Sequence, residues 1–469
     1  MKKFLLSALV ALMAVSASAI TDGQVYEEVN GIKCVNKWII SRVHSGELAY
    51  NALPIATNYA RSAVMHDGVV YISVTGARVV PNDTILQSIV YKYSAEDGTY
   101  LGELPLTLNG EPFATPAQSS LQANNIGVDN FGHMWLAGYS SEQNASCPFY
   151  MLDPATGALT PLATFEKGDI IARIDYFDVI GDITGEEAQC NIMAPGSNSP
   201  TVYAWHYDQG DSPEDWVGGF DGDPSIDIRF FWPEEVTLWG YAPMIRQCLG
   251  MDPEEEDYYN GDLFYVDAFT TAPILYDRAG TVQDCFDTDY VDPALIPEPG
   301  ANGVAEFHLD DRNFLAYAKA QYTGDGHGCQ INVCEMGEGM TFEGMNKYWQ
   351  LPADSLGHTS DSGIRLHCIQ VEYDTDAQGE ELIRLLTYKC QNGFGVYEIG
   401  KNVEAPQPQG KKGDVDGNGE VDGTDLNILI NILLGKDQNN YDGRENVDEQ
   451  GGIDGNDLNL LINILLGKV

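Results

Sequence analysis

Basic residues are scarce in this chain. Its 469 residues include 25 Lys and Arg against 70 Asp and Glu, which gives a formal net charge of −45 at pH 7. An acidic surface repels phosphate groups, so this balance argues against nucleic acids and anionic membrane surfaces as partners. The acidic residues are spread along the sequence, as expected for a solvated surface that favours solubility and some divalent-cation binding outside the cell.

Long apolar runs are missing after the first residues, so we expect no membrane span. The one such run extends from Phe4 to Val15, between Met1-Lys2-Lys3 and the small residues Ser16-Ala17-Ser18-Ala19. This order is typical of a secretory signal peptide, which we place at residues 1–19. We therefore predict a secreted protein, extracellular or periplasmic. No cysteine lies near the cleavage site, so a lipoprotein anchor is not expected.

The cysteines lack a regular spacing. There are nine of them, an odd number, and none forms a Cys-x-x-Cys pair. A disulfide framework and a cysteine metal site both need such spacing, so we interpret these residues as small buried apolar side chains.

Common catalytic motifs are also absent. The sequence has no Gly-x-Ser-x-Gly elbow, no phosphate-binding Gly-rich loop and no zinc-protease helix. Two pairs of carboxylates are candidates for the acid and nucleophile of a glycosidase, namely Asp175 with Asp178 and Asp310 with Asp311, but no pair is selected by its context. Four scattered histidines are more often structural than catalytic, and these are His66, His133, His308 and His367.

Helical periodicity is rare before residue 402, where short β-rich runs alternate with Gly, Asp and Asn turns. The runs recur at intervals of roughly forty to fifty residues. They lie near residues 68–98, 126–157, 172–207, 241–276, 303–333 and 364–399. This pattern is similar to that of secreted β-propeller proteins, which implies a mainly β fold of about six blades over residues 20–402. A strand near Cys34–Ile40 would close the ring; a β-sandwich or two stacked β domains are the alternatives.

Aromatic residues are dense in one part of this region. They are Trp205, Tyr207, Trp216, Phe230, Phe231, Trp232, Trp239 and Tyr241. They form either a carbohydrate-binding patch or part of the core. The acidic, Gly-rich stretch from Asp208 to Asp227 is typical of a long surface loop, where binding residues often lie.

A duplication occupies the C-terminus after a Pro- and Gly-containing linker, which we place at residues 403–412. The segment that starts at Asp414 returns in relaxed form at Asn446, and each copy ends in Leu-Asn-(Ile/Leu)-Leu-Ile-Asn-Ile-Leu-Leu-Gly-Lys. In the first copy, oxygen-bearing side chains occupy places one, three, five, nine and twelve of a calcium loop, and Gly419 occupies the turn. Calcium prefers six to eight oxygen ligands, so the spacing predicts a calcium site.

Two loops of this kind, each closed by Asp and followed by a helix, resemble the type I dockerin module over residues 413–469. The resemblance implies a small all-α module and two calcium sites. The first comprises Asp414, Asp416, Asn418, the carbonyl of Glu420, Asp422 and Asp425. The second comprises Asn446, Asp448, Gln450, the carbonyl of Gly452, Asp454 and Asp457. Amides replace two carboxylates in the second site, so we expect it to bind calcium more weakly.

The resemblance also implies a partner, because dockerins bind cohesin modules and place their cargo in assemblies that commonly degrade polysaccharide. The partner-selecting positions correspond to Gly423, Thr424, Gly455 and Asn456, which depart from the hydroxylated residues frequent in the family. Apolar stripes on the two helices should bury each other, and calcium would stabilise so small a unit.

The sequence thus favours a secreted, non-catalytic or carbohydrate-recognising propeller carried on a calcium-binding docking module. One alternative is a propeller-fold glycoside hydrolase or polysaccharide lyase. Another is a structural surface protein that uses calcium for folding alone. Carboxylates facing the central channel would favour the enzyme, and aromatic residues on a flat face would favour binding.

Overall fold

The chain divides into two compact units, Met1–Val403 and Glu404–Val469. The computed structural model describes residues 24–81, 85–116, 123–138, 146–169, 172–184, 188–208, 216–228, 230–231, 235–236, 239–249, 262–269, 271–298, 300, 302–320, 329–359, 367–404, 412–416, 421–437, 445–447 and 453–466. The predicted signal peptide and most of the predicted linker lie outside these residues, so both stay predictions. Among the described residues, no helix has the length and apolar character needed to cross a membrane.

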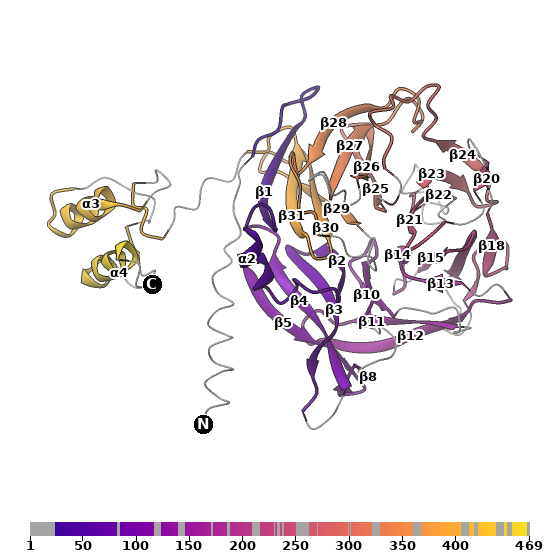
Figure 1. Ribbon diagram of the computed structural model, residues 1–469, viewed down its shortest axis with the longest axis horizontal. Coiled ribbons are helices and arrows are strands. Elements are labelled where there is room, and N and C mark those ends of the chain that lie inside the picture. Colours follow the sequence, from indigo (N-terminus) through magenta and orange to yellow (C-terminus); the bar gives the residue numbers. More distant parts are fainter. Residues whose placement is uncertain are drawn as a thin grey trace. The chain divides into compact units, whose positions relative to one another are not determined.

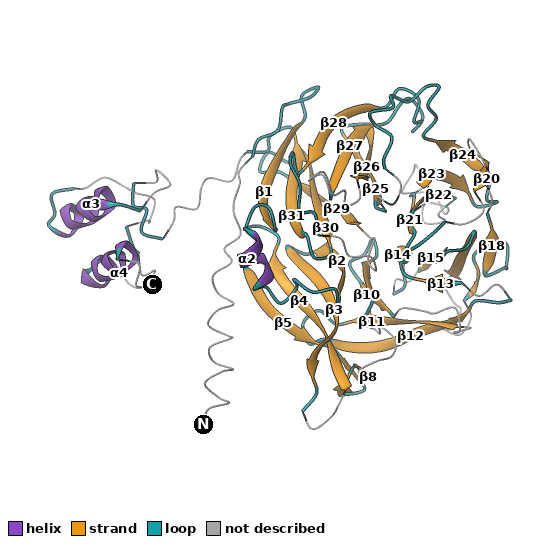
Figure 2. Cartoon of the chain, viewed as in Figure 1, coloured by secondary structure: helices purple, strands orange, loops and turns teal. Residues whose placement is uncertain are grey.

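The N-terminal unit is a ring of antiparallel sheets, as Figures 1 and 2 show. Blade 1 contains β2 (Ala60–His66), β3 (Val69–Val79), β4 (Ile85–Ser94) and β5 (Tyr100–Pro105), with β8 (Ala114–Pro116) beside β4. Blade 2 contains β9 (Asn125–Val128), β10 (Met134–Ala137), β11 (Ser146–Leu152) and β12 (Ala158–Glu166), with β6 (Thr107–Leu108) and β7 (Glu111–Pro112) at its outer edge.

Blades 3 and 4 follow in chain order. Blade 3 contains β13 (Arg173–Ile174), β14 (Asp178–Asp182), β15 (Gln189–Ser197), β16 (Thr201–Asp208), β17 (Val217–Gly218) and β18 (Ser225–Asp227). A separate hairpin pairs β19 (Phe230–Phe231) with β20 (Glu235–Val236). Blade 4 contains β21 (Met244–Gln247), β22 (Leu263–Ala268), β23 (Thr271–Asp277) and β24 (Val282–Cys285). The described part of the predicted 208–227 loop therefore includes two short strands, β17 and β18, which pair with β16.

Blades 5 and 6 complete the ring. Blade 5 contains β25 (Val304–Leu309), β26 (Arg312–Ala320), β27 (Gln330–Glu335) and β28 (Asn346–Leu351). Blade 6 contains β29 (His367–Thr375), β30 (Glu381–Lys389), β31 (Gly393–Gly400) and, from the other end of the chain, β1 (Lys33–Ser41). A short helix, α2 (Glu47–Asn51), follows β1. The prediction of a six-bladed propeller is confirmed, and the alternatives of a sandwich or two stacked domains are wrong.

Strand β1 closes the ring as predicted. It pairs antiparallel with β31, so that Cys34 lies opposite Ile399 and Ile40 opposite Phe394. The side chain of Trp38 is fully buried, and its indole N–H donates to the carbonyl of Ala95 at 2.7 Å. This pairing removes an open sheet edge and joins the first strand of the ring to its last blade.

The core of the propeller lies between blades. Six apolar clusters each combine side chains from two neighbouring sheets, and β1 supplies residues to the clusters on both sides of blade 6. The innermost strands contact one another in the circular order β2, β9, β14, β21, β25 and β29. Because these strands surround the axis, residues more than three hundred positions apart meet there.

The C-terminal unit contains two helices, α3 (Gly423–Leu433) and α4 (Gly455–Leu465), which pack together. Leu429 and Leu461 are fully buried between them, beside Val415 and Val447 from the preceding segments. The apolar stripes expected on the helices comprise Leu426, Leu429, Ile430 and Leu433 on α3 and Leu458, Leu461, Ile462 and Leu465 on α4. This expectation is corrected at three positions, because Ile430, Leu433 and Ile462 lie outside the cluster, and Leu433 is 36% exposed.

Candidate functional site

The first predicted calcium loop brings three carboxylates together. Oxygens of Asp414, Asp416 and Asp425 lie within 4.8 Å of one another. Asp414 and Asp425 are 1% and 0% exposed, respectively. Ligand oxygens lie about 2.3–2.6 Å from a calcium ion, so a shared ion requires separations of this size. Three carboxylates this close, two buried and one partly buried, repel one another unless a cation lies between them, so these residues fit calcium.

Asp425 is held in place by the backbone of the loop. Its Oδ1 accepts N–H groups from Val415 (2.7 Å) and Asp416 (3.1 Å), and its Oδ2 accepts the N–H of Asp422 (2.8 Å). Asp422 in turn accepts the N–H of Thr424 and caps α3. These hydrogen bonds hold the carboxylate that closes the loop in a fixed orientation.

The second loop repeats this arrangement at its helical end. The N–H of Asp454 donates to Oδ2 of Asp457 at 2.7 Å, and Asp454 caps α4 through the N–H of Asn456. The Oδ1 of Asn446 is buried and has no hydrogen-bond partner among the described residues. An orphaned oxygen at loop place one suits a metal ligand. The other predicted ligands Asn418, Glu420, Asp448, Gln450 and Gly452 lie outside the described residues.

The four predicted partner-binding residues stand at the starts of the helices. Gly423, Thr424, Gly455 and Asn456 are all exposed. A Cβ added to either glycine meets no atom within 4 Å, so larger side chains fit at both positions without disturbing the module.

Of the four carboxylates considered in the sequence, Asp175, Asp178 and Asp310 have structural partners, whereas Asp311 is exposed. Asp175 binds Arg173 at 2.7 Å, and Asp310 binds Lys401 at 2.6 Å. Asp178 accepts from Arg246 (2.9 Å) and from the N–H of Gln247 (2.8 Å), which fixes the arginine beside the propeller axis.

The aromatic group divides between core and surface. Trp205 and Trp239 are 3% and 1% exposed, whereas Tyr241 is 50% exposed. Trp216 stands over Phe165 at 5.0 Å between ring centroids and lines a hollow of about 700 Å³ along β12 and β17. Tyr207 is partly buried beside Trp216. The remaining members are Phe230, Phe231 and Trp232, whose side chains lie outside the described part.

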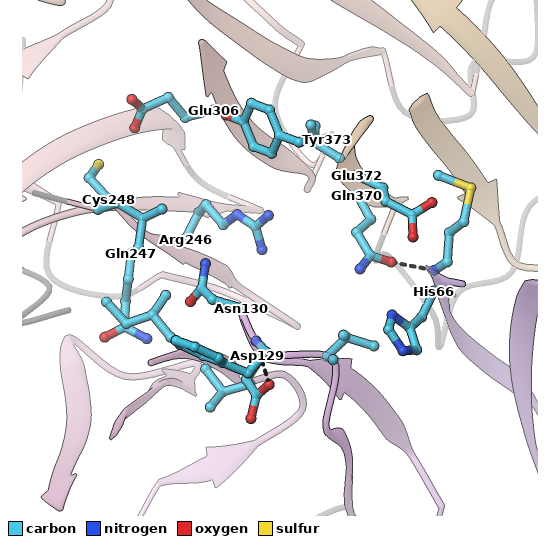
Figure 3. Close-up of a pocket in the computed structure, with 18 of the residues that line it drawn as sticks. His66, Asp129, Asn130, Arg246, Gln247, Cys248, Glu306, Gln370, Glu372 and Tyr373 are labelled. Atoms are coloured by element: carbon cyan, nitrogen blue, oxygen red, sulfur yellow. Dashed lines mark hydrogen bonds between the residues drawn. The ribbon is translucent and has the colours of Figure 1, made fainter. Parts of the chain in front are cut away.

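A cavity of about 460 Å³ lies on the propeller axis, where the first strand of each blade turns into the second (Figure 3). Its polar residues come from five inner strands or the turns that follow them. They are His66, Asp129, Asn130, Arg246, Gln247, Glu306, His308, Gln370, Glu372 and Tyr373. Figure 3 shows Arg246 extending into the cavity, with Glu372 and His66 on the opposite side. Below it, the axis narrows to a space of about 20 Å³, enough for one water molecule.

Two carboxyl groups of this cavity keep an oxygen without a partner. Oε1 of Glu372 accepts the N–H of Asp67 at 3.0 Å, whereas its Oε2 has no hydrogen-bond partner among the described residues. Oε2 of Glu306 is similarly unpartnered, and its side chain is 8% exposed. Burial raises the pKa of Glu306, which favours its protonated form. Within the described part, no three metal-ligating side chains converge in this cavity.

This cavity was not predicted from the sequence. Arg246, Glu306 and Glu372 carry no motif, and His66 and His308 each look structural in isolation. Their common signal is position, since each lies on the innermost strand of its blade or at its end. By contrast, His367 is 1% exposed and is bonded to Thr387, as expected for a structural histidine. His133 has partners in Asp129 and Thr184.

All nine cysteines lie in the described part of the chain, where none is paired in a disulfide, and eight of them are buried. Burial raises the pKa of eight of these thiols above the ordinary range, among them Cys34 and Cys248. This agrees with the interpretation of the cysteines as small apolar side chains.

Solved structures with similar shapes are distant. A DUF4623 family protein from Bacteroides eggerthii is 14% identical over 74% of this chain and 72% of that chain, with a TM-score of 0.47. Trypanosoma rangeli sialidase in complex with sialic acid is 8% identical over 72% and 53%, with a TM-score of 0.36. A putative 6-phosphogluconolactonase from Bacteroides fragilis is 12% identical over 83% and 98%, with a TM-score of 0.35. These values carry no argument about function.

Among proteins with curated descriptions, none matches this sequence. Residues 412–466, however, match the family model of the dockerin type I domain. Dockerin type I domains bind calcium and cohesin modules, and the proteins that carry them are typically extracellular. The predicted C-terminal type I dockerin module is therefore confirmed over residues 412–466, as is the six-bladed propeller that precedes it.

Proposed function

We propose that this protein is secreted and brings a carbohydrate-recognising propeller into an extracellular polysaccharide-processing assembly. Its C-terminal module binds calcium and docks onto a cohesin-like module. The observation that carries this proposal is the cluster of Asp414, Asp416 and Asp425, of which the first and last are buried, within the segment that matches the dockerin type I domain.

Calcium stabilises the fold of the C-terminal module in this proposal. The first site uses the three clustered aspartates with Asn418, Asp422 and the carbonyl of Glu420. The second uses Asn446, Asp448, Gln450, Asp454, Asp457 and the carbonyl of Gly452. Each ion joins a loop to the start of the following helix, so its binding energy contributes to the folding of the module. The exposed residues Gly423, Thr424, Gly455 and Asn456 then face the partner.

The docking part is tested with the full chain and a panel of immobilised cohesin modules, by biolayer interferometry in calcium and in EDTA. We expect capture in calcium alone. The double variant Asp414→Ala/Asp425→Ala should lose both calcium and capture. The variant Gly423→Arg/Gly455→Arg should keep calcium but lose capture, because both positions are open and stand at the proposed contact. Capture by none of the panel, with calcium bound, would favour the structural role for calcium instead.

Hydrolysis is a second candidate function, because Glu306 and Glu372 line the same cavity on neighbouring blades. A carboxyl group whose pKa is raised can donate a proton to a glycosidic oxygen while a second carboxylate assists on the other side. Release of reducing sugar by the full chain from a panel of polysaccharides tests it. If wild type releases reducing sugar and Glu306→Gln does not, the protein is an enzyme. If no polysaccharide on the panel is cleaved, carbohydrate recognition without hydrolysis is favoured.

A further inference from the structure

The axial cavity is a blind pocket. Beyond Arg246 and Gln370, the channel between the inner strands shrinks to about 20 Å³, whereas the cavity above measures about 460 Å³. A polymer cannot pass along such an axis, because the narrow part holds about one water molecule. The larger space lies within the usual range for small-molecule sites, about 300–1,000 Å³. A carbohydrate chain can therefore enter this cavity only with one of its ends.

We propose that this cavity binds the end of a neutral carbohydrate chain, one or two sugar rings deep. The inference rests on the carbohydrate recognition proposed above and assigns it to a site. With such a site, the propeller recognises the ends of carbohydrate chains rather than their internal segments.

The cavity lining offers both hydrogen-bond donors and acceptors, as sugar hydroxyl groups require. Arg246 donates one N–H to Asp178 and is held beside the cavity by that pair, with its side chain 24% exposed. Across from it, Glu372 uses one oxygen for the N–H of Asp67 and has the other unpartnered. Each sugar hydroxyl donates and accepts, so a pair of neighbouring hydroxyls can satisfy a carboxylate and a guanidinium together.

Glu306 adds an independent reason to expect a ligand. Its side chain is 8% exposed, and Oε2 has no hydrogen-bond partner among the described residues. The other oxygen lies 3.5 Å from Nε2 of His308. A buried polar oxygen without a partner costs free energy, which a ligand hydroxyl would recover on entering the cavity.

Aromatic side chains stand among the cavity-lining residues and are exposed. Phe131 is 53% exposed, and Tyr373 is 55% exposed. Phe131 is positioned by the turn that begins at Asp129, whose Oδ1 accepts the N–H groups of Phe131 and His133. The hydroxyl of Tyr373 accepts the N–H of His308 on the neighbouring blade, which fixes its ring. An aromatic face suits the C–H face of a sugar ring.

The charges of the site favour a neutral sugar over an acidic one. Among the described lining residues, Arg246 is the one Arg or Lys, and Asp178 already balances it. An acidic sugar would also meet the carboxyl groups of Asp129 and Glu372, on a chain whose net charge is −45.

The test measures binding of sugars to the full chain in calcium by isothermal titration calorimetry. The probes are neutral mono-, di- and trisaccharides of glucose, xylose, mannose and galactose, with uronic-acid counterparts. Phe131→Ala removes the aromatic face, and Glu372→Gln removes a charged acceptor while retaining an oxygen for Asp67. Tyr59→Ala is the matched control, because Tyr59 is 46% exposed and lies outside the cavity lining.

We expect a neutral sugar to bind the wild type, with affinity lowered about tenfold or more in both cavity variants and unchanged in the control. Circular dichroism and an unchanged melting temperature check that the variants are folded. A polymer should also compete better after it has been cut to oligomers at constant mass, since cutting multiplies its ends.

Three results would overturn the inference. If wild type and both cavity variants bind equally well, the cavity is not the site, although carbohydrate recognition itself stands. Binding of acidic sugars alone would contradict the neutral ligand. If no sugar on the panel binds, carbohydrate recognition and the cavity assignment fail together, while the calcium-dependent docking is left to its own test.

Discussion

At the scale of single residues, Asp425 combines two tasks. It accepts three backbone N–H groups of its loop, and it completes a cluster of carboxylates with Asp414 and Asp416. The spacing of these acids was readable in the sequence, because loop place, residue type and the following apolar stripe all agree. The hydrogen bonds that orient Asp425 were not, since they depend on the path of the backbone.

We predict that Asp425→Asn weakens calcium binding at the first loop by about tenfold or more, because it removes a charge from the ligand set. Calcium titration calorimetry of the full chain should then report one site of reduced affinity. The matched variant Asp457→Asn should weaken the second site and leave the first unchanged. If both calcium affinities are unchanged in one of these variants, the loop that carries the substitution is not a calcium site.

A buried acid in blade 4 makes the stability of the propeller depend on pH. Asp267 is 0% exposed, and burial raises its pKa well above the usual value of 3.8. At pH values between the unfolded-state pKa, near the usual value, and the higher folded-state pKa, the folded protein retains a proton that the unfolded chain has released. The stabilisation is therefore complete below about pH 4 and declines as the pH rises.

We predict that Asp267→Asn removes this decline, because the amide stays neutral and keeps an oxygen for the N–H of Gly303. In differential scanning calorimetry the variant should melt close to the wild type at pH 4 and above it at pH 8. A gap between the two proteins that is equal at both pH values would show that Asp267 does not retain its proton.

At the scale of elements, local chemistry was easier to predict than assembly. The Asp-x-x-Gly turn from Asp129 to Gly132 forms as its sequence indicates, because the aspartate accepts the following N–H groups and Gly132 takes a φ of +84°. Strand β1 was predicted to close the ring because an open edge is unfavourable, and it does.

The contribution of β1 can be measured through Trp38. This side chain is fully buried, packs against Phe394 and donates to Ala95. Trp38→Ala should lower the free energy of unfolding of the propeller by about 3–5 kcal/mol, the usual cost of such a truncation. Urea denaturation measures it, with Tyr59→Ala as a control expected to change stability by less than about 0.5 kcal/mol. If the free energy of unfolding falls by less than about 1 kcal/mol, the pairing of β1 contributes little to the stability of the propeller.

The axial cavity marks the limit of prediction from sequence. His66, Arg246 and Glu372 belong to different blades, and each has an ordinary local context. Their convergence depends on the order in which the inner strands surround the axis, which a single sequence does not specify. The calcium loops were accessible because all their ligands lie within one short segment.

At the scale of the whole molecule, the chain combines two units with different sources of stability. The propeller has six apolar clusters between blades, whereas the C-terminal unit has one small cluster around Leu429 and Leu461. Metal binding should therefore matter for the second unit alone.

We predict two transitions in differential scanning calorimetry of the full chain. Calcium at a hundred times its dissociation constant should stabilise the C-terminal unit by about 2.7 kcal/mol per site and raise its melting temperature. The propeller transition should not move between calcium and EDTA. If the C-terminal unit melts at the same temperature in calcium and in EDTA, calcium does not stabilise its fold.

In the proposed function, one chain joins a partner protein to the end of a carbohydrate. The most direct test captures the full chain on an immobilised cohesin module in calcium and then supplies a soluble neutral oligosaccharide. We expect sequential binding of the chain and the sugar, loss of both signals in EDTA, and loss of the sugar signal alone in Phe131→Ala. A captured chain that binds no sugar, or a chain that no cohesin captures, would contradict the account.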